Sequence, residues 1–167
     1  DPKYPQAVGI SQILAMANTF GNFDWEVLVN DLDDSPYFTS DFPIAIEETS
    51  DPRIIARLVP LTPRVAVRLI PNLDAVDDER STPNFAFKHF RRRVVRATRN
   101  QIMAVNRQIV RGAEDVVFYS RDLPWVPRFV EKNASYRLET KTERMRHDGG
   151  TLLWSRLSLV ERSASAI

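Results

Sequence analysis

Residues 87–111 read FKHFRRRVVRATRNQIMAVNRQIVR, the longest helical pattern in the chain. At about 100° per residue, its apolar side chains fall within one half of a helical wheel. Gly112 follows the pattern as an expected C-terminal stop. We therefore expect one long amphipathic helix over Phe87–Arg111, packed against the core by its apolar side. The apolar positions are Phe87, Phe90, Val94, Val95, Ala97, Ile102, Val105 and Ile109.

The opposite side of this expected helix is basic, and it carries no acid. One interpretation is a core helix whose solvated basic side pairs with acids elsewhere in the domain. The other is a polyanion-binding site, because arginines bind phosphates in bidentate geometry and gain by counterion release. The residues that would form this site are Lys88, Arg92, Arg96, Arg99, Arg107 and Arg111.

Most other segments have the alternation or the β-branched composition of strands. Strands are expected over Phe23–Asn30, 37–39, 44–46, Ile54–Val59, Val65–Ile70 and Asp115–Tyr119. A hairpin is expected where Tyr136–Met145 and Thr151–Val160 flank Asp148-Gly149-Gly150. Helices are expected over Gln6–Phe20 and Asp122–Lys132. Because strands and helices do not alternate regularly, we predict an α+β fold: a mixed or mainly antiparallel sheet with the long amphipathic helix packed on it.

Length and composition are those of one globular domain covering residues 1–167, with a polar surface loop at 72–85. The absence of cysteine excludes a disulfide framework and a thiol nucleophile, and it suits a reducing cytoplasm. No apolar run approaches the roughly 18 residues of a membrane span. The start, Asp1-Pro2-Lys3-Tyr4-Pro5, has neither Met nor a signal peptide. We therefore expect a fragment of a longer chain that lacks an N-terminal segment.

The net charge of +1 conceals two opposed halves of the chain. No lysine or arginine lies between Tyr4 and Pro52, and no acid lies between Arg80 and Ala113. Several acids follow the first expected strand, where carboxylates can converge on Mg²⁺ or Mn²⁺. An ordinary acidic turn is the alternative, since the spacing is not that of a calcium loop. The candidate metal ligands are Asp31, Asp33, Asp34 and Asp41, of which Asp33, Asp34 and Asp41 are the residues we single out.

No complete catalytic apparatus is recognisable in the sequence. The chain has two histidines, His89 and His147, and neither lies in the pattern of a triad or a zinc site. The five glycines form no phosphate-binding loop and no dinucleotide fingerprint. Whether the protein is an enzyme is therefore left open.

An ordered series of short motifs resembles a known family. The series is Thr39-Ser40-Asp41-Phe42-Pro43, Val59-Pro60-Leu61-Thr62-Pro63, Val105-Asn106 and Val117-Phe118-Tyr119-Ser120. It resembles the C-terminal half of the bacterial family called domain of unknown function 4238. In that family Thr62 corresponds to a commoner Ser, and Val105 to a commoner Leu. The resemblance covers roughly Phe23–Lys132, but the histidine-containing signature that opens the family has no match here.

The residues of these motifs also have a direct physical interpretation. Ser40 and Asp41 can bond to nearby backbone groups and fix a turn, after which Pro43 starts a strand. Asn106 lies at the border between the apolar and basic sides of the expected helix. Ser40, Asp41 and Asn106 are therefore either structural pins or parts of one ligand site. For the site we predict that Asp41 contacts Asn106 or an arginine of the helix.

These observations support three hypotheses about function. The first is a bacterial cytoplasmic module that binds nucleic acid or another phosphate-rich partner through the arginine-rich helix. The second is a metal-dependent phosphodiester hydrolase that uses the carboxylates of residues 31–41. The third is a structural or protein-interaction domain without a ligand, in which acidic and basic halves pair within the fold.

Overall fold

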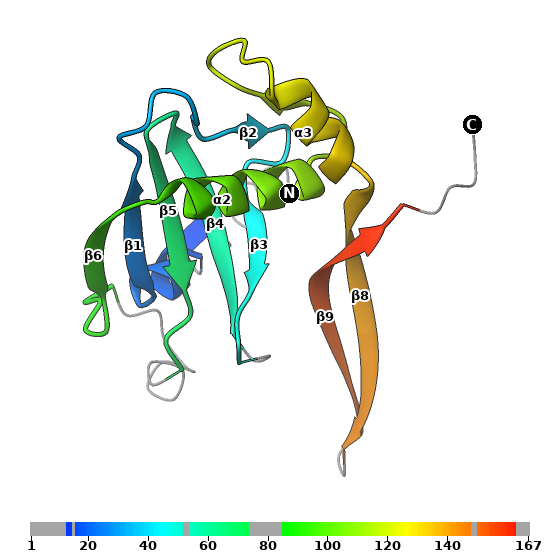
Figure 1. Cartoon of the computed structure of the whole chain (residues 1–167). Coiled ribbons are helices and arrows are strands. Elements are labelled where there is room, and N and C mark those ends of the chain that lie inside the picture. Colours follow the sequence, from blue (N-terminus) through cyan, green and yellow to red (C-terminus); the bar gives the residue numbers. More distant parts are fainter. Residues whose placement is uncertain (1–12, 15, 52–53, 74–84, 148–149, 163–167) are drawn as a thin grey trace, which may run out of the picture.

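A mixed five-stranded sheet forms the centre of the protein (Figure 1). A computed structural model describes residues 13–14, 16–51, 54–73, 85–147 and 150–162. All neighbouring strands run antiparallel except β1 and β6, which are parallel. The expected α+β fold is therefore confirmed. The sheet has the spatial order β3-β4-β5-β1-β6, with β1 at Asp24–Val29, β3 at Ala45–Glu48, β4 at Ile55–Thr62, β5 at Val65–Ile70 and β6 at Arg91–Arg96.

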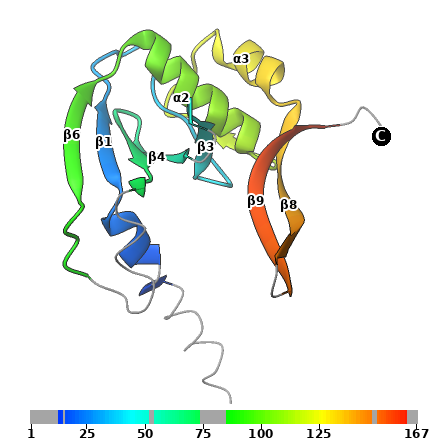
Figure 2. The same ribbon diagram turned by 90° about the horizontal axis from the view of Figure 1, so that it is seen from below.

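Helices lie on both faces of this sheet (Figure 2). Helix α2 (Arg99–Gly112) covers one face, and its apolar side forms the main core there. On the other face, the Trp25 indole Nε1 donates a hydrogen bond to the Phe20 carbonyl at 2.8 Å. Phe20 belongs to the helix predicted at the N-terminus; residues 13–14 and 16–21 are helical, and residues before 13 lie outside the described part. The fully buried residues of this core include Leu28, Leu58 and Ala66 of the sheet and Ile102, Val105 and Ile109 of α2.

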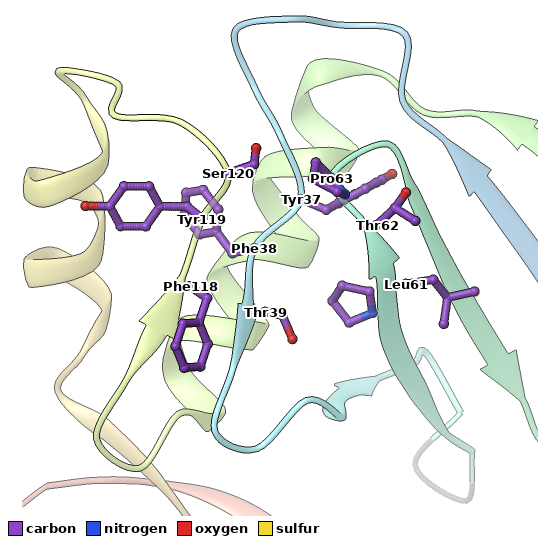
Figure 3. A pocket seen from close by; sticks show the side chains of 10 residues that line it. Tyr37, Phe38, Thr39, Leu61, Thr62, Pro63, Phe118, Tyr119 and Ser120 are labelled. Atoms are coloured by element: carbon purple, nitrogen blue, oxygen red, sulfur yellow. The ribbon is translucent and has the colours of Figure 1, made fainter.

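A second, very short ladder joins β2 (Thr39–Ser40) to β7 (Val117–Phe118) beside the main sheet (Figure 3). These strands are shorter than predicted. Phe38, just before β2, is fully buried and lies in an aromatic cluster with Tyr119, Trp125 and Phe129, at ring-centroid distances of 5.9, 5.7 and 6.0 Å. Helix α3 (Val126–Asn133) carries part of this cluster. It begins four residues later than predicted, so Pro124 precedes the helix instead of lying in its first turn.

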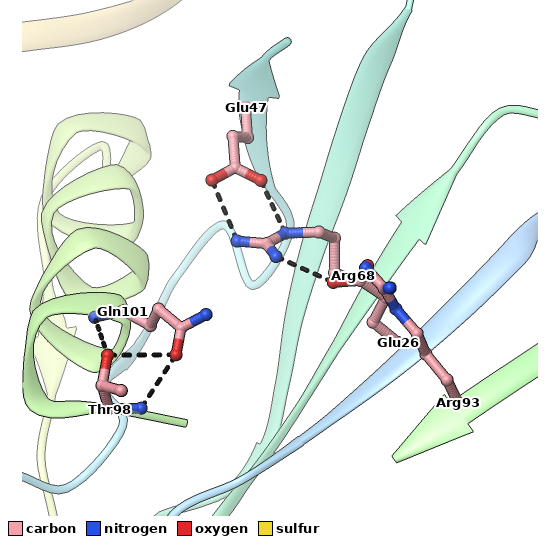
Figure 4. Close-up of polar contacts among 6 residues, drawn as sticks. All are labelled: Glu26, Glu47, Arg68, Arg93, Thr98 and Gln101. Atoms are coloured by element: carbon pink, nitrogen blue, oxygen red, sulfur yellow. Dashed lines mark hydrogen bonds and ion pairs between the residues drawn. The ribbon is translucent and has the colours of Figure 1, made fainter. Parts of the chain in front are cut away.

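The prediction of a single long helix over residues 87–111 is wrong in its first half. Residues 91–96 form strand β6, and α2 begins only after Thr98. Thr98 Oγ1 accepts a hydrogen bond from the Gln101 N–H, while Gln101 Oε1 accepts one from the Thr98 N–H at 2.8 Å (Figure 4). This reciprocal capping box fixes the start of the helix. Just before it, the Ala97 N–H donates to Val29 O at 2.8 Å, which extends the ladder between β6 and β1.

The predicted C-terminal hairpin is confirmed and forms a separate two-stranded sheet. It consists of β8 (Tyr136–His147) and β9 (Gly150–Glu161), and residues 148–149 of the expected turn lie outside the described part. Figure 1 shows the hairpin extending away from the five-stranded sheet. Its base is attached to the end of α2, because Arg162 Nη2 donates to the carbonyls of Ala113 and Glu114 at 3.1 and 2.7 Å. Within the described residues, no helix is both long enough and apolar enough to cross a membrane.

Candidate functional site

The predicted basic stripe does not lie on one helix. Lys88 precedes β6, Arg92 and Arg96 lie on β6, and Arg99, Arg107 and Arg111 lie on α2. On β6, Val95 pairs with Leu28 of the core, so the alternating positions Arg92 and Arg96 belong to the opposite face of the sheet from α2. The change from strand to helix therefore separates Arg92 and Arg96 from the three arginines of α2.

Three arginines are already paired with acids of the loop after β1. Arg96 lies 3.3 Å from Asp31, Arg99 is bonded to Asp34, and Arg64 from the β4–β5 turn is bonded to Asp33. The hydrogen bond from Arg99 holds the pKa of the Asp34 carboxyl below its ordinary value. Arg111 instead stacks on Tyr136, with its guanidinium carbon 4.5 Å from the ring centroid.

These ion pairs also occupy the carboxylates that were candidates for a metal site. Asp31, Asp33 and Asp34 each face a different arginine, so they diverge instead of meeting. In the part of the chain that the structure describes, no group of three histidine, aspartate or glutamate side chains could hold a metal ion. The residues present therefore do not fit the Mg²⁺ or Mn²⁺ site considered from the sequence.

Asp41 binds the loop that follows α2. Its carboxylate accepts hydrogen bonds from the backbone N–H groups of Asp115 (2.7 Å), Glu114 (3.1 Å) and Val116 (3.3 Å). These bonds, with the one from Asp115 strongest, hold the pKa of Asp41 below its ordinary value. Ser40 Oγ donates to Phe42 O at 2.7 Å and closes the expected turn.

Asn106 is fully buried, whereas it was expected at the border between the apolar and basic sides of the helix. Its Oδ1 accepts a hydrogen bond from the Phe38 N–H at 2.9 Å, and its Nδ2 donates to Pro36 O at 2.8 Å. Asn106 and Asp41 therefore hold the same segment at two places, residues 36–38 and residue 41. Among the described hydrogen bonds and ion pairs, Asp41 meets neither Asn106 nor an arginine, so the two residues act as separate structural pins.

A groove between α2 and α3 brings together cations and apolar side chains. It has a volume of about 730 Å³. Residues one turn apart on each helix line it: Arg99 and Met103 on α2, and Arg128 and Lys132 on α3. The rest of the lining is aromatic or proline: Pro124, Trp125 and Phe129. The contribution of α3 was not predicted from the sequence, although the spacing of Trp125, Arg128, Phe129 and Lys132 indicates one shared side of a helix.

The cations of this groove are only partly neutralised. Arg99 is bonded to Asp34, but for Arg128 and Lys132 the described residues provide no carboxylate partner. The aromatic side is fixed in place, because Trp125 Nε1 donates to Asp34 O at 3.1 Å and the indole stacks on Phe38 at an interplanar angle of 18°. The groove thus combines positive charge with half-buried rings of defined orientation.

A separate charged network crosses the sheet face beside α2 (Figure 4). Glu26, whose side chain is only 5% exposed, is bonded to Arg93 and lies 2.8 Å from Arg68. Arg68 also binds Glu47 at 2.7 Å. Two acids and two bases balance in this network, so it stabilises the sheet and offers no net charge to a ligand.

Comparisons with models of protein families, with curated proteins and with solved structures found no match. The resemblance to domain of unknown function 4238 therefore stays a prediction.

Proposed function

We propose that the protein binds nucleic acid, with the α2–α3 groove as its contact surface. The observation that carries this proposal is the joint presence of Arg99, Arg128 and Lys132 with the rings of Trp125 and Phe129 in one groove. Cations that neutralise phosphates release counterions, which supplies affinity without sequence specificity. Aromatic side chains next to the cations offer surfaces against which unpaired bases stack. The combination favours a single strand over a duplex.

Arg107 supports a longer contact surface along α2. It is exposed and follows Met103 by one helical turn, so a strand that leaves the groove would pass near its guanidinium. We also propose a bacterial, cytoplasmic setting, which the cysteine-free composition suits. The hydrolase hypothesis is not pursued, because the carboxylates that it requires are bonded to arginines and backbone groups.

The proposal predicts how charge removal on α3 changes binding. We expect Arg128→Gln and Lys132→Gln each to weaken binding to a fluorescein-labelled oligo(dT) by roughly tenfold, because each loses a charged contact. Each change should also reduce the steepness of log K against log salt by about 0.7, the value for one phosphate contact on a single strand. Fluorescence anisotropy across a salt series measures both quantities.

Lys141→Gln and Arg144→Gln are matched controls, because both residues are exposed on β8 and lie outside the groove. They should leave the affinity and the salt dependence unchanged. Absence of binding at low salt, or equal losses in the control variants, would contradict the proposal. That result would favour the structural hypothesis, for which the pairs Arg64–Asp33, Arg96–Asp31 and Arg99–Asp34 are specific support.

A further inference from the structure

A second pocket lies where the β4–β5 turn, the segment before β2 and the end of β7 meet (Figure 3). Its volume is about 280 Å³. Residues 37–39 form its floor, residues 60–63 form one wall, and residues 118–120 form the other. These segments are far apart in the sequence, so only the complete fold assembles the pocket.

Backbone hydrogen bonds hold both walls to the floor. The Tyr37 N–H donates to Pro63 O at 2.9 Å, which ties the floor to the β4–β5 turn. On the other side, Thr39 pairs with Phe118 in the β2–β7 ladder. Pro60 and Pro63 restrict the backbone of the first wall further. The pocket is therefore formed before any ligand arrives, which is typical of small-molecule sites.

Large apolar side chains of this pocket remain open to solvent. Leu61 is 61% exposed, Phe118 is 54% exposed and Tyr119 is 42% exposed. Single exposed apolar residues are common, but a group of them around one hollow marks a binding surface. The walls therefore suit a ligand with an apolar body.

A cationic hollow continues from one end of this pocket. It has a volume of about 390 Å³, shares Thr62, Pro63 and Ser120 with the first pocket, and adds two arginines, Arg64 and Arg121, and one acid, Asp33. Arg64 is bonded to Asp33. Arg121 approaches only the Asp33 carbonyl oxygen, at 3.5 Å, and the described residues give it no carboxylate partner. One guanidinium at this end is therefore available to an anion.

We propose that this continuous groove binds a small carboxylate with an apolar body. The apolar part lies between Leu61 and Phe118, and the carboxylate binds the Arg121 guanidinium, which offers paired donors in a planar fork. This site is independent of nucleic-acid binding, because it shares no lining residue with the α2–α3 groove. Either proposal can fail without the other.

The test is a titration of the ¹⁵N-labelled protein with 3-phenylpropanoate, followed by two-dimensional ¹H–¹⁵N NMR. We expect the amide signals of Thr39, Thr62 and Ser120 to shift in a saturable way. The neutral analogue 3-phenylpropanamide should bind about tenfold more weakly, because it forms no charged pair with Arg121. In Arg121→Gln the two compounds should bind equally, while Arg92→Gln, an exposed arginine on β6, should keep the difference.

The apolar contact has its own variant and control. Leu61→Ala should weaken 3-phenylpropanoate binding by about tenfold, because it removes a contact of a few methylene groups. Val94→Ala alters a residue of similar exposure (62%) on β6 and should have no effect. The proposal is overturned if the amide binds the native protein as well as the acid does. Shifts confined to the α2–α3 groove, or self-association through Phe118, would overturn it equally.

Discussion

At the scale of single residues, the buried polar groups show which contacts the fold requires. Asn106 satisfies both its oxygen and its nitrogen on one backbone segment, which explains how it can be fully buried. Tyr37 behaves differently, since its buried hydroxyl has no hydrogen-bond partner among the described residues. Burial raises the pKa of this phenol to about 12, although the charge of Arg68 acts in the opposite direction.

The pKa of Asp41 leads to a prediction about pH and stability. Its pKa is lowered in the folded protein by backbone N–H groups, so its contribution to stability is complete above the unfolded value of about 4. That contribution is lost as the pH falls through the lower, folded pKa. We expect Asp41→Asn to unfold at a lower urea concentration than the native protein at pH 7, and the difference to shrink in acid.

Urea unfolding at several pH values measures this difference. Asp122→Asn is a suitable control, because Asp122 is exposed and no hydrogen bond of its side chain is found in the described region. Asp122→Asn should unfold at the same urea concentration as the native protein at every pH. A destabilisation of Asp41→Asn that stays constant from neutral pH to acid would show that charge on Asp41 is unimportant.

At the scale of secondary structure, the charged network on the sheet gives a second stability prediction. Arg68→Met leaves Glu47 without a cation and leaves Glu26 with Arg93 alone, in a region where the two carboxylate side chains are only 24% and 5% exposed. Removing one partner of a buried pair is strongly destabilising, so we expect the free energy of unfolding to fall by about 3 kcal/mol. Chemical denaturation monitored by circular dichroism checks this value.

Arg92→Met provides the comparison on β6, the edge strand of the same sheet, where the arginine is exposed. Its effect should stay within about 0.5 kcal/mol. Arg68→Met would have to be as stable as the native protein to contradict this prediction. The view of the network as a stabilising contact would then be wrong.

The sequence predicted elements well where one signal dominated. Val65–Ile70 is rich in β-branched residues, and the hairpin strands flank the sequence Asp148-Gly149-Gly150, so local composition sufficed for both. The segment 91–96 was assigned to a helix because its arginines and valines fit a helical wheel. An edge strand that is exposed along most of its length shows no strict alternation, so periodicity could not separate the two states. Thr98 with Gln101 was the overlooked signal, since this spacing is that of a capping box.

The candidate sites were less predictable than the elements. A groove between two helices depends on how α3 is placed against α2, and this placement depends on the buried ring of Phe38. A local sequence pattern does not indicate how two helices pack against each other. Asp41 was expected to bond to nearby backbone groups, and its partners at residues 114–116 could not be identified from the sequence.

At the scale of the whole molecule, the two proposed sites meet at one aromatic cluster. Phe38 lines the carboxylate pocket and also contacts Trp125 and Phe129 of the α2–α3 groove. Ion pairs between the loop after β1 and later arginines hold distant parts of the chain together. The acidic and basic segments of the sequence therefore form ion pairs with each other within the fold. The described residues provide no such partner for the cations Arg128 and Lys132 on α3.

The order of strands in the sheet predicts the order of events in folding. Strands β4 and β5 are neighbours in sequence and in space, whereas β6 pairs with the distant β1. Closing the longer loop loses more chain entropy, so we expect β6 to join the sheet late. Val67→Ala on β5 should slow folding, while Val95→Ala on β6 should mainly speed unfolding. Stopped-flow chevron plots separate these effects, and slower folding in Val95→Ala would contradict the proposed order.

The late arrival of β6 has a consequence during synthesis on the ribosome. The four antiparallel strands β1, β3, β4 and β5 are complete when residue 70 has emerged, but β6 ends only at residue 96. Until then β1 is an edge strand with unpaired backbone groups, and such an edge can pair with another nascent chain. Chaperone binding to the nascent protein should therefore be strongest after residue 70 has emerged and before residue 96 has emerged. It should end when Thr98 has capped α2.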